Sequence, residues 1–159
     1  MFLVLFLLLP SLGLHSQTLL KENTNLEWNS WKFVFPKPAV YKEEGGQNPK
    51  LTIYPAREDE FFVVVRVLPF SLGSIDDAKW EKMVFTRPKE FQKQEITLQN
   101  ATFLVYEADQ IRNQNLLHNQ VWISKEKDTP IWVWVQWKKS NAELGSYFGS
   151  GSFLSISRP

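Results

Sequence analysis

Apolar and polar residues alternate along several stretches of the chain, with the period of two that indicates β-strands. Residues 31–35 alternate in this way, and two prolines follow directly. Residues 61–68 instead form a continuous apolar run that only Arg66 interrupts. Such a run is typical of a central strand that is covered on both faces. The pattern therefore predicts a sheet with residues 61–68 near its middle.

Two hairpins and two short strands complete the predicted β-structure. The hairpins follow from paired apolar stretches around short polar turns, whereas the charged, glycine-containing stretch 41–48 is interpreted as a loop. The predicted strands are 51–54, 94–98 with 101–107, 116–124 with 131–137, and 152–157.

Two helices are predicted from their start and stop signals. Ser74 with Asp77 resembles a capping box, and the helix it begins runs to about residue 85 before Pro88. Asn141 caps a second, short helix that presents Leu144, Tyr147 and Phe148 and that Gly149 is placed to end.

This order of elements predicts an α+β fold, in which a single, mostly antiparallel sheet has helices packed on it. The hairpin-length connections between the middle strands are the reason for expecting antiparallel pairing. An all-β sandwich is the alternative if the helix predictions fail. No repeat, low-complexity tract or linker divides the chain, so we expect residues 17–159 to form a single globular domain.

The order also resembles that of the PsbP-like and DcrB-like proteins, which are small extrinsic or periplasmic domains. The resemblance rests on the aromatic strand WKFVFPKP, the capped helix after the third strand, the two central hairpins, and the short helix leading into SFLSI. It covers about residues 28–156. It implies one antiparallel sheet between helices and an accessory or binding role. It carries over no site residue, because members share no active site.

The first sixteen residues predict a secretory signal. An apolar run covers residues 2–9, Pro10 breaks it, and small residues follow as far as Ser16. This run is too short for a membrane span, which needs about 20 apolar residues, but it suits a cleavable signal. We therefore expect cleavage of residues 1–16 and an exported protein without a stable membrane span. The alternative is a buried N-terminal strand or helix.

Composition narrows the chemistry of the mature chain. The sequence has no cysteine, and His118 is the one histidine outside the expected signal. This composition excludes metal sites with two histidines, thiolate sites and most nucleophile–base pairs. We therefore expect no metal, no cofactor and no enzyme activity. A net charge of +1 gives no field that recruits nucleic acid. The absence of disulfides favours a bacterial envelope protein, either periplasmic or secreted.

Aromatic residues supply the remaining signal, with 7 Trp, 12 Phe and 4 Tyr. In the last long hairpin we expect Asn119, Val121 and Ile123 to face the main core together with the alternate residues 131, 133, 135 and 137. The opposite side then carries a set of candidate binding residues, which Arg66 and Tyr106 can join from their own strands. These candidates are His118, Gln120 and Trp122 on one strand, beside Ser124, and Trp132, Trp134 and Gln136 on the other.

Two interpretations of this aromatic face compete. A helix can cover it, because large aromatic side chains commonly anchor such packing. If it stays open, exposed indoles with flanking amides suit the stacking of sugar rings or the capture of a partner's side chains. We expect an accessory or binding protein whose partner is another envelope protein or a glycan; the alternative is a carbohydrate-binding module or a weak glycan-acting protein.

Overall fold

Two antiparallel sheets and one helix make up the part of the chain that the computed structural model describes, residues 17–56, 61–68, 91–99, 101–128 and 130–157. The large sheet has eight strands in the order β1-β4-β5-β6-β10-β9-β8-β7. In chain order its strands are β1 (Thr18–Leu20), β4 (Ala39–Glu44), β5 (Lys50–Pro55), β6 (Phe61–Val67), β7 (Gln92–Leu98), β8 (Ala101–Arg112), β9 (Asn115–Ser124) and β10 (Ile131–Lys138).

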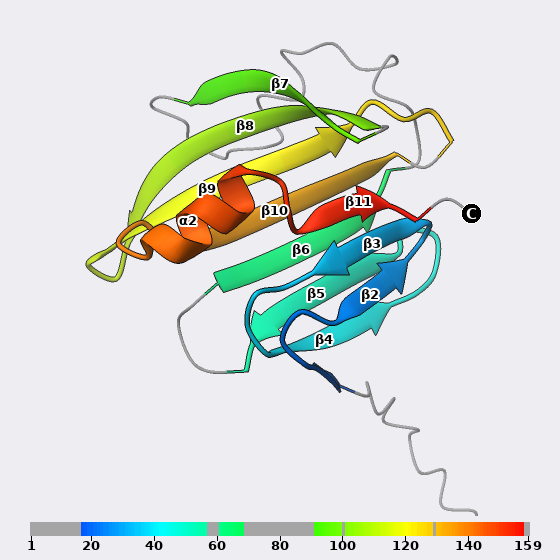
Figure 1. The fold of residues 1–159 in the computed structure, drawn as a ribbon, viewed down its shortest axis with the longest axis horizontal. Helices are drawn as coiled ribbons and strands as arrows, with labels where there is room; N and C mark the ends of the chain where they lie inside the picture. The colour runs from blue at the N-terminus through cyan, green and yellow to red at the C-terminus, as the bar shows by residue number, and fades with distance from the viewer. Residues whose placement is uncertain (1–16, 57–60, 69–90, 100, 129, 158–159) are drawn as a thin grey trace, which may run out of the picture.

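The small sheet has the order β11-β3-β2 and joins both ends of the chain. Its strands are β2 (Asn25–Trp28), β3 (Trp31–Val34) and β11 (Leu154–Ile156). The helix α2 (Ala142–Gly149) lies beside it, over the same face of the large sheet (Figure 1). One face of the eight-stranded sheet is thus covered by a second layer, which consists of the small sheet and α2.

Aromatic contacts hold the two layers together. From the small sheet and its flank, Trp31 meets Phe103 at 5.4 Å between ring centroids, and Phe35 stacks on Phe61 at 5.6 Å. From the helix, Phe148 packs 5.4 Å from Trp137. Large aromatic side chains bury about 150–250 Å² each, so these rings supply much of the apolar burial. We call the covered face the core face and the other the outer face.

The α+β prediction is wrong, because strands dominate the described residues and α2 is the one helix among them. This architecture fits the all-β alternative. The stretch 41–48 was interpreted as a loop, but residues 41–44 belong to strand β4, and residues 25–28 add strand β2. Both strands are short. They form because β2 pairs with β3 and β4 pairs with β5, and not because of a strong local pattern.

Local signals succeeded where a cap or a long alternation was present. Asn141 is the N-cap of α2, and its Oδ1 accepts a hydrogen bond of 3.1 Å from Leu144 N. The predicted hairpins correspond to β7–β8 and β9–β10, and residues 61–67 form the near-central strand β6. The helix expected at residues 74–85 lies outside the described residues.

Candidate binding groove

The candidate residues do not share one surface. In the β9–β10 pairing, Trp122 lies opposite Val133, and Trp134 lies opposite Val121. Residues directly opposite one another project from the same face of a sheet. Trp122 therefore lies on the core face, whereas Trp132 and Trp134 lie on the outer face. The expectation that the three indoles meet is wrong, because the pairing is offset by one residue from the assumed one.

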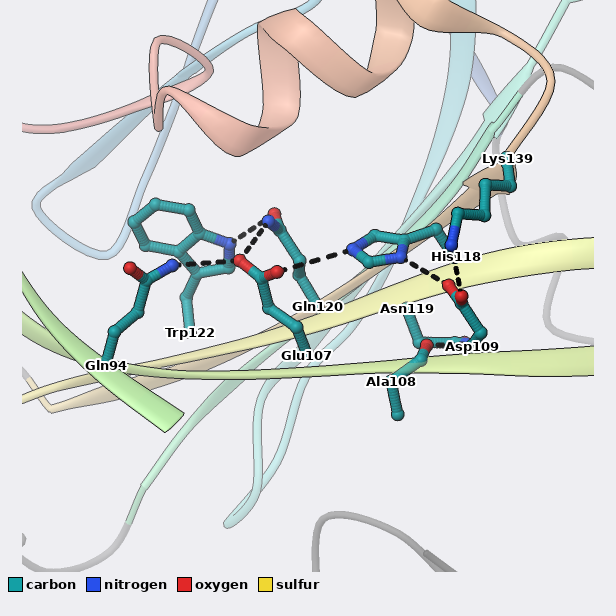
Figure 2. A network of polar contacts seen from close by, with 9 residues as sticks. All are labelled: Gln94, Glu107, Ala108, Asp109, His118, Asn119, Gln120, Trp122 and Lys139. Carbon is teal, nitrogen blue, oxygen red and sulfur yellow. Dashed lines mark hydrogen bonds and ion pairs between the residues drawn. The ribbon is translucent and has the colours of Figure 1, made fainter. Parts of the chain in front are cut away.

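Trp122, Gln120 and His118 belong to a polar network at the edge of the core (Figure 2). Trp122 is fully buried, and its Nε1 donates to Gln120 Oε1 at 3.1 Å. Gln120 Nε2 in turn donates to Glu107 Oε1 at 2.8 Å, and Gln94 Nε2 donates to the same oxygen at 2.9 Å. The network thus connects strands β7, β8 and β9.

His118 links two carboxylates in this network. Its Nδ1 lies 2.7 Å from Asp109 Oδ1, its Nε2 lies 3.6 Å from Glu107 Oε2, and Lys139 forms an ion pair with Asp109. The nearby carboxylate of Glu107 raises the pKa of His118, with Asp109 adding to the effect against the opposing effect of burial. His118 lowers the pKa of Glu107. Burial acts to raise the pKa of Asp109, but Lys139 and His118 outweigh it and lower that pKa.

This arrangement ties three strands of the large sheet together. A general base needs an unprotonated, available nitrogen near the proton that it removes. Both ring nitrogens of His118 instead face carboxylates, which favours the charged imidazolium. The network includes no hydroxyl side chain among its members in Figure 2. Within the described residues, no group of three or more His, Cys, Asp or Glu is placed to hold a metal ion.

The outer face carries a shallow groove across β5, β6 and β10. Its volume is about 300 Å³, and its floor consists of side chains that alternate with core residues on each strand. The lining residues are Lys50, Thr52 and Tyr54 from β5, Phe62, Val64 and Arg66 from β6, and Trp132 and Trp134 from β10. We call this feature the aromatic groove.

Aromatic side chains in the groove form a connected, partly exposed row. Tyr54 lies 5.4 Å from Phe62 between ring centroids, and Phe62 meets Trp134 edge-on at 5.5 Å. Trp132 and Trp134 are half-buried, and Tyr54 is 41% exposed. The two earlier interpretations therefore apply to different residues: the outer-face indoles are partly exposed, whereas Trp122 is completely covered.

Asn119 fixes the orientation of one indole. Trp134 Nε1 donates to Asn119 Oδ1 at 3.1 Å, and Gln136 Nε2 donates to the same oxygen at 2.7 Å. Asn119 is itself buried and also donates to Ala108 O at 3.4 Å. A side chain held by such a network keeps its rotamer without a ligand, which lowers the entropic cost of binding.

Polar and charged groups border the aromatic row. Lys50 Nζ lies 3.1 Å from Glu44 Oε2, and this contact, with help from Lys42, lowers the pKa of Glu44. Arg66 is exposed and has no ion-pair partner within the described residues. The Thr52 hydroxyl is buried and also lacks a hydrogen-bond partner among them. An unsatisfied buried hydroxyl costs about 1–3 kcal/mol, and the large majority of buried side-chain polar atoms in proteins have a partner.

Sequence reasoning found part of this groove and missed the rest. Trp132, Trp134 and Arg66 were recognised, but Tyr54, Phe62 and Thr52 were not. Tyr106 does share the outer face, yet it is fully buried, in a cluster with Leu104, Val121 and Ile123 against which Trp132 and Trp134 pack. The missing signal was the alternation within residues 61–67, which places Phe62 and Arg66 on one side once β6 is paired with β10.

Comparisons with known proteins identify no relative of this chain. No protein-family model matches the chain, and neither a curated protein nor a solved structure was found to be similar to it. The resemblance to PsbP-like and DcrB-like proteins accordingly stays a prediction. None of the helices in the described part of the chain is long and apolar enough to cross a membrane.

Proposed function

We propose that this protein is an exported, non-enzymatic binding protein of the bacterial envelope, and that the aromatic groove is its binding surface. Export is supported by the apolar run and small residues of the first sixteen positions. A binding role is supported by the groove, because it combines fixed indoles with open apolar surface and charge.

The observation that carries the proposal is the partial exposure of Trp132, Trp134 and Tyr54 on one face. Tryptophan, tyrosine and arginine are the residue types most often found where truncation costs the most binding energy. Here all three types line the same groove, and a hydrogen bond from Trp134 to Asn119 orders one of the indoles in advance. Binding therefore requires little rearrangement of the protein.

The polar network around His118 supports the non-enzymatic part of this proposal. Its histidine, amides and carboxylates already bond with one another. A catalytic group needs a free reactive atom beside a substrate, whereas these atoms are occupied by their neighbours in the fold. Stabilising the sheet is the role that this geometry supports.

Co-sedimentation with isolated bacterial envelope fractions tests the proposal. The chain beginning at Gln17 is mixed separately with purified peptidoglycan sacculi and with envelope membrane vesicles that retain their proteins. We expect the unmodified chain to sediment with one of these fractions. Trp132→Ala should lower the affinity at least about tenfold, because an aromatic anchor contributes roughly 2 kcal/mol or more of binding free energy. Expression of the full chain in a bacterium is expected to yield protein without residues 1–16, as measured by intact mass.

A matched variant distinguishes binding through the groove from nonspecific adsorption through exposed apolar surface. Ile111 is 77% exposed at the tip of the β8–β9 hairpin, so Ile111→Ala removes exposed apolar surface outside the groove. It should leave sedimentation unchanged. Circular dichroism of Trp132→Ala is the check that this variant is folded. The proposal is abandoned if the unmodified chain sediments with neither fraction, or if both variants lose binding equally.

A further inference from the structure

The charge along the groove narrows the kind of ligand that it suits. Arg66 lies opposite Lys50 on one side and opposite Trp132 on the other, so two cations and an indole form one row across three strands. The next row places Thr52, Val64 and Trp134 side by side. Among the described residues that line the groove, none is an aspartate or a glutamate. The groove is therefore aromatic at one end and basic at the other.

Arg66 is the cation that is free to bind a ligand. Lys50 and Lys42 both pair with Glu44, so these three side chains together leave one positive charge. Arg66 adds a second, and within the described residues it has no carboxylate partner. A guanidinium binds a carboxylate through two parallel hydrogen bonds, which gives direction as well as attraction.

The position of the groove within the sheet also limits how a ligand can bind. Strands β5, β6 and β10 lie inside the sheet, and each has paired neighbours on both sides. An extended peptide that binds by adding a strand requires a free edge with unpaired backbone groups. Recognition here has to use side chains: flat indole and phenyl surfaces, the Trp132 indole nitrogen and one guanidinium. A chain of rings with carboxylate substituents offers matching groups.

We propose that the aromatic groove binds an acidic oligosaccharide, with a carboxylate of one sugar on Arg66 and pyranose faces of adjacent sugars against Trp132 and Trp134. This inference rests on the proposed function and specifies its ligand class. The two indoles lie two residues apart on one strand, about 6.8 Å by strand geometry, so they can contact successive parts of one chain. A nucleic acid suits the groove less well, since its phosphates require several free cations in a row.

Tryptophan fluorescence titration with a defined acidic sugar tests the inference. The probes are tetragalacturonate, the uncharged tetrasaccharide maltotetraose, and a poly-glutamate peptide of similar charge. We expect tetragalacturonate to bind with an affinity at least about tenfold higher than that of maltotetraose, as measured by the change in fluorescence. A hydrogen-bonded ion pair contributes at least that factor to the affinity. Binding should weaken as salt is raised.

Arg66→Gln is the decisive variant, since an exposed side chain can be replaced without disturbing the core. It should weaken tetragalacturonate binding about tenfold and leave maltotetraose unaffected, while Arg66→Lys retains part of the affinity. Lys32→Gln removes one positive charge from β3, in the layer on the other side of the molecule, and should change nothing. Equal affinity for maltotetraose, no effect of Arg66→Gln, or tighter binding of poly-glutamate each overturns the inference.

The outcome also separates this inference from the broader proposal. If the chain sediments with an envelope fraction through Trp132 but does not bind tetragalacturonate, the ligand class is wrong and the binding role stands. If tetragalacturonate binds through Arg66 but no envelope fraction does, the envelope role is wrong and the ligand class stands.

Discussion

Gly151 occupies a position where both backbone and space exclude a side chain. Its φ of +73° lies in the left-handed region, directly after the end of α2. A Cβ atom there would lie 2.5 Å from Leu98 Cδ1 and 2.9 Å from Trp122 Cη2. The turn that leads from the helix to β11 therefore passes closely over the buried indole. This packing explains the glycine at position 151.

We expect Gly151→Ala to lower the free energy of unfolding by about 2–4 kcal/mol, the sum of left-handed strain and overpacking. Urea denaturation followed by tryptophan fluorescence measures it. Gly45→Ala is the matched control, because nothing lies within 4 Å of a Cβ at that position. Equal losses in the two variants would show that the contact with Trp122 is unimportant.

Two-residue turns determine how the hairpins close. Asn29 and Ser30 connect β2 to β3, and Asn113 and Gln114 connect β8 to β9; all four residues have positive φ. Two successive left-handed residues are the signature of a type I′ turn, which prefers Asn followed by Gly. The second residue of each turn is thus strained, and the pairing of the flanking strands maintains it.

Gln114→Gly should relieve that strain and raise the free energy of unfolding by about 0.5–1 kcal/mol. Thermal and urea unfolding provide the measurement. Gln110→Gly serves as the comparison, because Gln110 lies in the same hairpin without a positive φ and its replacement should destabilise by a similar amount. The strain argument fails if both variants are destabilised.

The same elements show what a sequence can and cannot predict here. The alternation in 131–138 and the cap at Asn141 are local, and both elements were predicted within about one residue. The register between β9 and β10 is not encoded locally: either face of residues 118–124 carries apolar side chains, so pattern alone does not decide which one meets Val133. A shift by one residue exchanges the faces, and this separated Trp122 from the groove.

At the scale of the whole molecule, the His118 network makes stability depend on pH. The pKa of His118 is raised above 6.5, so its contribution is complete below that value and is lost as pH rises through the folded-state pKa. The pKa values of Glu107 and Asp109 are lowered, so their contribution is complete above about 4.5 and is lost as pH falls through their folded-state values. The network therefore stabilises most between about pH 4.5 and 6.5.

His118→Gln isolates this effect, since the chain beginning at Gln17 has no other histidine. We expect the unmodified chain to exceed the variant in unfolding free energy by about 1 kcal/mol near pH 5.5, with the difference shrinking toward pH 8. Urea denaturation across this range is the measurement. A difference independent of pH would mean that His118 acts through packing against Trp137 alone.

The pairing of Trp31 with Ile156 has a consequence for how the protein is made. Strand β3 acquires one of its two neighbours only when β11 is present, and the pairing of β6 with β10 likewise joins segments far apart in sequence. Such long-range pairings make folding slow, because the ends of long loops must meet before any contact rewards them. The small sheet therefore cannot close before β11 has been synthesised. For the export proposed above, this delay would give the chain time to cross a membrane while still extended.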